Sequence, residues 1–345
     1  MTLSTEIHEQ PETIRRLLAD QREQAVAVAD RWRRAAPTHV VIAARGTSDN
    51  AARYAQYLWG QRAGLTVGLA APALFAPTGV PPRLDGAAVV GISQSGASPD
   101  LVAVLREAAR QGRPTLAITN DPGSPLAAAA EQVLALGVGE ERAVAATKTY
   151  TAELAAVALL AAALAPNDAD AAELASLPAS VAASLRDESM IAEVAGRWSD
   201  FDRCAVLGRG TGLATAHEWA LKLQELAYVL AQPASPADFA HGPRAVVEPG
   251  FPVLAVATEG PWRAGMVGTL AALREQGART LVLGEPGADL DPVTDDLLAV
   301  PAGVPDWLAP IVSIVPAQLW CLHVTLARGG DPDAPRSLTK VTRTH

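Results

Sequence analysis

The sequence has little cysteine, few aromatic residues and little charge. It contains two cysteines in 345 residues, 4% aromatic residues and 19% charged residues. Cys204 and Cys321 each lie within an apolar run, so we interpret them as reduced core thiols of a cytosolic protein. Two cysteines cannot build a metal cluster, and we expect neither a metal nor a cofactor.

Positive charge is also scarce. Lysine and arginine total 28 against 37 acidic residues, which gives a formal net charge of −9. Nucleic-acid phosphates are bound by clustered lysine and arginine, so this balance argues against nucleic acid as a partner. It leaves room for one small phosphorylated ligand, because backbone N–H groups and hydroxyls can hold a single phosphate in an acidic protein.

No long hydrophobic run is present. The most apolar stretch, residues 154–165, is dominated by alanine and stops at Pro166, which is too short to cross a bilayer. Residues 1–16 are polar and lack the apolar core of a signal peptide. We therefore predict a cytoplasmic protein with no membrane partner.

A weak internal repeat is the main organisational feature. Arg45-Gly46-Thr47 and Arg209-Gly210-Thr211 each follow a strand-like run, 164 positions apart. Residues 105–118 resemble residues 273–283, with Thr115 and Thr280 offset by 165. Two anchors at nearly the same offset indicate a domain duplication.

Short β-branched runs alternate with helical patterns in both copies. This alternation predicts an α/β fold of two tandem domains, each a doubly wound, flavodoxin-like parallel sheet flanked by helices. The predicted strands are residues 39–43, 65–69, 87–92, 115–119 and 132–136, then 204–207, 252–257, 280–283 and 297–300. We expect a helical segment at 1–34, domains at 35–166 and 198–330, a helical connector at 167–197 and a tail at 331–345.

The strongest motif follows the strand at 87–92. Ser93, Gln94, Ser95 and Ser98 precede a helix that Pro99 opens, so hydroxyls and free N–H groups gather at a positive helix end. That arrangement suits a phosphate monoester. Ordinary helix capping is the alternative, but it needs fewer serines.

Two further loops have weaker signals. Thr47 and Ser48 occupy the matching place after the first strand, where an N-cap without a ligand is equally reasonable. Val144 lies in a loop before a helix that Thr147 could cap. For both loops, ligand contact and plain capping stay open.

The predicted helix 212–230 carries charges on an otherwise apolar surface. Glu218, Lys222 and Glu225 are spaced four and three apart, so they share one face. They are either a solvated ion-pair row or a proton-relay group in a cleft. His241, at a Gly-Pro turn, and Lys340, near the end of the chain, are by default a structural histidine and a solvated lysine.

Six ordered segments together resemble the sugar isomerase (SIS) domain family, over nearly the whole chain. The likeness is greatest to the isomerase half of glutamine–fructose-6-phosphate aminotransferase and to amino-sugar-6-phosphate deaminases without a glutaminase domain. The segments are Gly46-Thr47-Ser48, Ser93-Gln94-Ser95-Gly96, Ala146-Thr147-Lys148, Glu218-x-Ala-Leu-Lys222-Leu-x-Glu225, His241-Gly242-Pro243 and Pro335-Arg336-x-Leu-x-Lys340.

The resemblance implies a role for each of these positions. The serine loop would hold the sugar phosphate, lined by Thr47, Ser48 and Val144. Glu225 would move a proton between C1 and C2, supported by Lys222 and Glu218. His241 would come from the neighbouring subunit of a homodimer and assist ring opening, and Lys340 would reach the open-chain carbonyl.

The departures shape the expected reaction. We find no cysteine before Cys204 to act in a glutaminase domain, so the resemblance implies an amino-sugar-6-phosphate deaminase/isomerase that releases ammonia. Arg45 and Ala146 replace a cysteine and a serine common in the synthases, so the identity of the sugar is left undetermined. The alternatives are a fructosamine-phosphate deglycase, a ketose/aldose phosphate isomerase, or a non-catalytic sugar-phosphate sensor.

Overall fold

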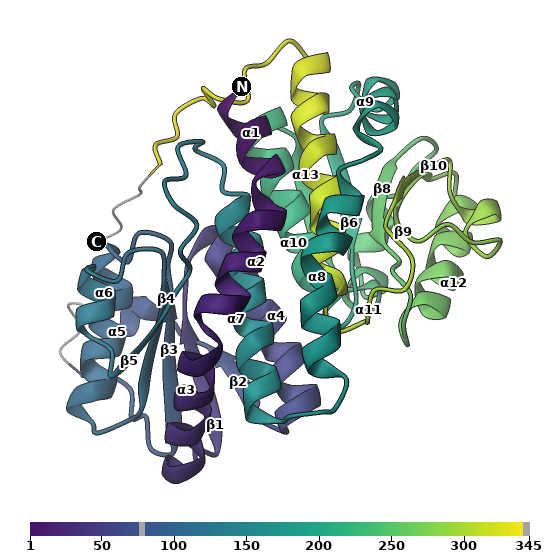
Figure 1. Cartoon of the computed structure of the whole chain (residues 1–345). Coiled ribbons are helices and arrows are strands. Elements are labelled where there is room, and N and C mark those ends of the chain that lie inside the picture. Colours follow the sequence, from purple (N-terminus) through teal and green to yellow (C-terminus); the bar gives the residue numbers. More distant parts are fainter. Residues whose placement is uncertain (76–79, 341–345) are drawn as a thin grey trace. The chain divides into compact units, whose positions relative to one another are not determined.

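The computed structural model describes residues 1–75 and 80–340, so the last five residues of the expected tail lie outside it. The described chain forms two compact units, each with its own five-stranded parallel sheet (Figure 1). The first-sheet unit comprises Glu12–Glu141 and Lys148–Ser176, with Thr339 and Lys340. The second-sheet unit comprises Met1–Pro11, Arg142–Thr147 and Leu177–Leu338. Each is described by itself.

The first sheet has the strand order β2-β1-β3-β4-β5, with every pair parallel. This is the predicted doubly wound arrangement, and the order reverses between β1 and β3. Loops that follow these two strands therefore border the crevice where such sheets bind ligands. The strands are β1 (His39–Ala43), β2 (Thr66–Leu69), β3 (Ala87–Ile92), β4 (Thr115–Thr119) and β5 (Gln132–Ala135).

Helices cover both faces of the first sheet. An apolar cluster that includes Val89, Leu105 and Leu126 packs α5 and α6 on one face. The other face is covered by α4, against which α7 packs, with α3 against α7 (Figure 1). The helices are α2 (Gln10–Asp20), α3 (Arg22–Ala35), α4 (Gly46–Ala63), α5 (Pro99–Arg110), α6 (Pro125–Ala128), α7 (Lys148–Leu164) and the first half of α8 (Asp170–Ser184).

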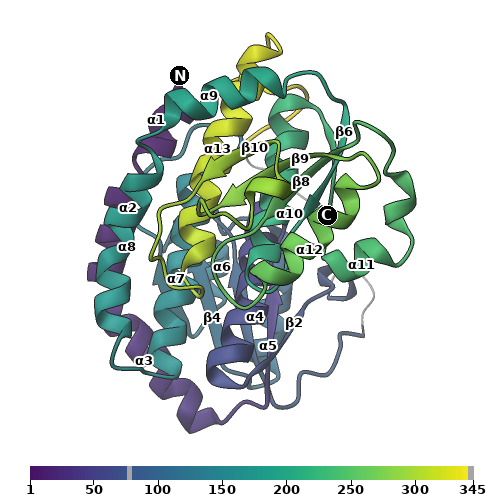
Figure 2. The same ribbon diagram turned by 90° about the vertical axis from the view of Figure 1, so that its right-hand side faces the viewer.

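The second sheet repeats this topology, with the order β10-β9-β8-β6-β7 and parallel pairing throughout. Its helices α10 and α13 lie on one face and α12 on the other (Figures 1 and 2). The strands are β6 (Arg203–Leu207), β7 (Leu230–Ala234), β8 (Pro252–Val256), β9 (Arg279–Gly284) and β10 (Asp296–Ala299). The helices are α1 (Thr2–His8), α9 (Glu188–Arg197), α10 (Gly212–Lys222), α11 (Pro236–Ala240), α12 (Arg263–Arg274) and α13 (Ala309–Ala327).

The structure differs from the sequence prediction between residues 212 and 234. The α-helix ends at Lys222, and one π-helical turn, Leu223–Ala227, follows it. The chain then forms β7, which was not predicted. Pro233 interrupts its strand pattern, but β7 is an edge strand, where a residue without an N–H group is tolerated.

The expectation that the sequence has no long hydrophobic run was wrong, because the helix α13 is long and apolar enough to cross a membrane by length and composition. However, 89% of its apolar window is buried inside the protein, as expected for the core helix of a domain.

The short helix α1 organises a loop of its own unit. The buried Glu6 carboxylate accepts the N–H groups of Arg142 and Ala143, at 2.6 and 3.2 Å. One turn later, the Gln10 amide donates to Gln318, whose own amide donates to the Thr147 carbonyl. The segment Arg142–Thr147, which contains Val144, is thus held by two polar side chains four residues apart.

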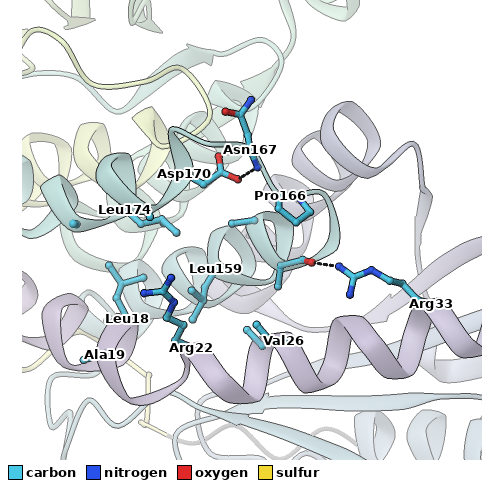
Figure 3. Close-up of a pocket in the computed structure, with 15 residues that line it drawn as sticks. Leu18, Ala19, Arg22, Val26, Arg33, Leu159, Pro166, Asn167, Asp170 and Leu174 are labelled. Carbon is cyan, nitrogen blue, oxygen red and sulfur yellow. Dashed lines mark hydrogen bonds between the residues drawn. The ribbon is translucent and has the colours of Figure 1, made fainter.

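A cavity of about 610 Å³ opens among the helices α2, α3, α7 and α8 of the first-sheet unit (Figure 3). Leu18, Val26, Leu159 and Leu174 give it apolar walls. Its acidic residue, Asp170, is paired with Arg62. With apolar walls and a neutralised carboxylate, the cavity offers no acid–base group for catalysis.

We predict that Glu6→Ala destabilises the protein. The variant removes the Glu6 acceptor from two backbone N–H groups, and losing it at the buried Ala143 costs about 1–3 kcal/mol. Chemical denaturation measures the difference. Glu12→Ala is the control, because the Glu12 side chain is exposed and pairs only with surface arginines. A Glu6→Ala midpoint equal to that of the control would contradict this role.

Candidate active site

The serine loop, residues 93–98, connects β3 to α5 and rests on the chain that follows β4. The Ser93 N–H donates to Ile118, and the Gln94 carbonyl accepts from Asn120, both at 3.1 Å. Gly96 has a φ of +58°, and a Cβ there would lie 2.1 Å from the Ser124 hydroxyl oxygen. Only glycine fits this turn, so the neighbouring segment fixes the shape of the loop.

The loop hydroxyls are arranged as donors. The Ser93 and Ser95 oxygens accept the N–H groups of Gly96 and Ala97, at 3.2 and 3.3 Å. Within the described ranges we find no acceptor for their hydroxyl protons. Ser98 is the N-cap residue of α5, as predicted, but its side chain forms no capping hydrogen bond. Donors that await an acceptor suit a phosphate better than plain capping does.

One buried carboxylate, Glu141, ties this loop to the tail. It is 5% exposed, and its Oε2 atom accepts from the Gln94 amide at 3.0 Å and from the Lys340 ammonium at 2.8 Å. The backbone N–H and hydroxyl of Thr149, at the start of α7, also donate to Glu141. Sequence reasoning missed Glu141. Its only local signal is a pair of adjacent glutamates after β5.

A second ion pair lies beside the serine loop. Arg45, which follows β1, donates from Nε and Nη2 to the buried Asp100 carboxylate at 3.1 and 2.9 Å. Half of the Arg45 side chain remains exposed. Because Asp100 lies in the first turn of α5, the pair places a cation next to the loop. The sequence marked Arg45 only as a departure from the related synthases.

The two residues predicted near the first strand differ in their surroundings. The Ser48 hydroxyl donates to the buried Glu153 on α7 at 2.7 Å, so its proton is already used. Thr47 is half-buried in the first turn of α4.

The charged group at the end of α10 forms as the spacing suggested. The Lys222 ammonium lies 3.3 Å from Glu218 and 2.5 Å from Glu225. Lys222 and Glu218 are 1% and 0% exposed, whereas Glu225 is 24% exposed. A solvated ion-pair row is therefore excluded, and Glu225 is the member of the trio that solvent or a ligand can reach.

The carboxylates decide the protonation state of Lys222. Burial alone would lower its pKa, because it penalises the charged form. Glu218 and Glu225 outweigh this effect and raise the pKa of Lys222 above its ordinary value. Lys222 is thus a cation at neutral pH.

The remaining predicted residues are less constrained. His241 is exposed at the end of α11, and within the described ranges its ring forms no hydrogen bond or ion pair with Glu225. Val144 is half-buried in the segment Arg142–Thr147 of the second-sheet unit.

In the second copy, the crevice is nearly filled, with only about 10 Å³ left beside Trp262. Gly46 and Gly210 occupy matching turns with φ values of +53° and +58°. A Cβ on Gly46 would meet no atom within 4 Å, whereas a Cβ on Gly210 would lie 2.1 Å from the Trp262 indole nitrogen. Trp262 fills the place that stays empty in the first copy. The matching stretch of the second copy, Thr258-Glu259-Gly260, also lacks the serines of the first.

These features belong to one protein family. The chain is a member of the SIS domain family, because the sequence model of that domain matches residues 35–163 and 199–328. The two matches correspond to the two sheets.

Individual relatives within the family show which proteins the chain is similar to. The chain is 34% identical over 337 residues to glutamine–fructose-6-phosphate aminotransferase [isomerizing] of Methanothermobacter thermautotrophicus, covering 97% of this chain and 56% of that protein. It thus spans about half the length of such relatives. Its structure is similar to the C-terminal domain of glucosamine-fructose-6-phosphate aminotransferase from Francisella tularensis, with a TM-score of 0.87, 27% identity and 97% and 98% of the two chains covered. It is equally similar to a Silicibacter pomeroyi protein described as a "putative phosphosugar isomerase", with a TM-score of 0.87, 34% identity and 96% and 100% covered.

We predict that Lys222→Met is strongly destabilising. It leaves two neighbouring carboxylates without their counter-charge, and breaking such a buried pair costs about 3–5 kcal/mol. Denaturant unfolding measures the loss, and Glu225→Gln, at the partly exposed position, should cost less than about 1 kcal/mol. The contribution of Lys222 to the free energy of unfolding should be constant between about pH 6 and 9. Because its pKa is raised in the folded protein, this contribution is fully present below the unfolded-state pKa and is lost only at higher pH. Equal losses in the two variants would refute the buried trio.

The two matching glycines give a paired prediction. Gly46→Ala should cost about 1 kcal/mol of unfolding free energy, because alanine disfavours a positive φ. Gly210→Ala should cost about 1–3 kcal/mol more, because its Cβ collides with Trp262. Removing the indole in Gly210→Ala/Trp262→Ala should abolish this additional cost. Equal losses for the two single variants would mean that Trp262 does not fill the second crevice.

Proposed function

We propose that this chain is an amino-sugar-6-phosphate deaminase/isomerase, which converts a substrate like glucosamine 6-phosphate to fructose 6-phosphate and ammonia. The observation that carries the proposal is the Glu218–Lys222–Glu225 trio, in which one carboxylate reaches the surface and the other two groups are buried. A sensor would need no such buried charges, which cost free energy to maintain. The names of the aminotransferase relatives support the substrate class.

In this proposal, the serine loop binds the phosphate. Ser93, Ser95 and Ser98 supply hydroxyl donors, and Gln94 is held in place by Glu141. Thr47, Ser48 and Val144 line the site. Because the Ser48 hydroxyl already donates to Glu153, we assign Ser48 a role in shaping the pocket.

Glu225 is proposed to transfer the proton. After the ring opens, its carboxylate removes the proton from C2 of the amino aldose while the C1 oxygen takes up a proton, which gives an enolamine. Return of the C2 proton to C1, with loss of one proton from the nitrogen, gives a 2-imine. Water adds to this imine, and its collapse releases ammonia and the ketose phosphate. Lys222 holds Glu225 in place through their ion pair, while Glu218 offsets the lysine charge.

The proposed roles of His241 and Lys340 complete the site. We propose a homodimer in which His241 of the partner subunit assists ring opening, which agrees with the exposed position of His241 here. Lys340 is proposed to reach the open-chain carbonyl. The chain has only three lysines among its 28 cationic residues, at 148, 222 and 340. An arginine cannot condense with a carbonyl, so a lysine kept at 340 fits this chemistry.

The two cysteines of this sequence are buried, and burial raises the pKa of the Cys204 and Cys321 thiols above the ordinary range. Neither is suited to take ammonia from glutamine, because thiolates are the reactive form.

We predict ammonia release from glucosamine 6-phosphate, measured in a coupled assay. Glu225→Gln should lower kcat by about 10²–10⁴-fold, as expected for loss of a general base. Glu248→Gln, at an exposed glutamate paired with Arg203, should leave the rate unchanged. Full activity of Glu225→Gln would reject the mechanism, and no ammonia from any hexosamine phosphate would reject the deaminase.

The same experiment separates the other enzymatic candidates. A panel of fructosamine phosphates and unsubstituted ketose phosphates distinguishes a deglycase and a simple isomerase by the product that forms. Borohydride reduction with fructose 6-phosphate, followed by peptide mass spectrometry, tests the carbonyl role of Lys340, because only three lysines can carry the adduct.

A further inference from the structure

Residues 328–340, the described part of the chain after α13, have no regular secondary structure, yet they are attached to the protein at several points. The Asp333 carboxylate accepts the N–H groups of Thr2 and Leu3, at 2.8 and 2.9 Å, and so caps the start of α1. Lys340, seven residues later, reaches Glu141. Arg336 lies between these two attachments along the chain.

Arg336 is held twice by one side chain, that of Tyr228. Its guanidinium carbon lies 3.6 Å from the centroid of the Tyr228 ring, a cation–π contact. Its backbone N–H also donates to the Tyr228 hydroxyl at 2.9 Å. Side chain and main chain of one tail residue are thus fixed by the same tyrosine, which sets the register of the tail.

Tyr228 has an unusual backbone conformation. Its φ is +58°, a left-handed conformation that glycine adopts readily and that is uncommon for a bulky residue. It directly follows the π-helical turn Leu223–Ala227, which carries Glu225. Strained positions of this kind persist where the surroundings require them, and they are frequent at functional sites, as are π turns.

We propose that Tyr228 and Arg336 form a clamp that positions Lys340, with both acting as positioning residues. Tyr228 comes three residues after Glu225, and Arg336 comes four residues before Lys340. One turn therefore carries the proton-transfer carboxylate and also fixes the segment that supplies the lysine. The inference rests on the proposed function for the role of Lys340, but the clamp itself can be tested without activity.

A lysine-specific endoproteinase tests the clamp directly. Lys148 and Lys222 are 3% and 1% exposed, so cleavage of the native protein reports on Lys340, whose side chain is 22% exposed. Tyr228→Ala and Arg336→Ala should speed cleavage after Lys340 by about tenfold or more. Tyr228→Phe keeps the ring and loses the hydroxyl, so its cleavage rate should lie between those of the two alanine variants and that of the native protein. Leu338→Ala, an exposed tail residue outside the clamp, is the matched control.

Tyr228→Gly separates the clamp from general stability. Glycine tolerates the positive φ, so the denaturation midpoint should be unchanged or higher while cleavage at Lys340 becomes faster. A lower midpoint with unchanged cleavage would overturn the clamp, as would native cleavage rates in both Tyr228→Ala and Arg336→Ala.

Ammonia release then tests the positioning role. The clamp variants should lower kcat about tenfold with little change in KM, and should have no further effect in a Lys340→Ala background. Full activity of the clamp variants beside an inactive Lys340→Ala would overturn the positioning role and leave the proposed function standing. A fully active Lys340→Ala would instead reject the assigned role of Lys340.

Discussion

The hydrogen bonds to the buried Glu141 carboxylate are the interactions on which the proposed phosphate-binding loop depends. A buried carboxylate is costly unless it is fully hydrogen-bonded, and here the donors come from a loop, a helix terminus and the tail. Glu141 thus joins three segments that lie far apart in the sequence.

The same principle operates at the other charged cluster, with the charges reversed. There, a buried ammonium is stabilised by two carboxylates, and Glu225, within the π-helical turn, contacts Lys222 while it keeps contact with solvent. In each case, one exposed group is held by partners that are almost wholly buried. Such support fixes the position of a side chain without closing it off.

The predictability of these features depends on how local they are. The serine loop could be predicted, because its serines, glycine and proline lie within eight residues and carry their own turn and helix-start signals. The trio could be predicted from helical spacing. The π turn could not, because no residue type in that segment is specific to a π-helical turn. Glu141 could not be predicted, because its partners are 47, 8 and 199 positions away. The strand β7 was missed because only its place at the sheet edge makes Pro233 acceptable.

The indole of Trp262 gives the duplication a consequence for stoichiometry. Two copies of a ligand-binding sheet would ordinarily offer two sites that could communicate within one chain. Trp262 leaves only about 10 Å³ in the second crevice, so among the described residues the proposed phosphate-binding position of the first copy has no equally open counterpart. Under the proposed function, saturation by a phosphorylated ligand should then follow a simple hyperbola for each protomer. Any cooperativity would then have to arise between chains.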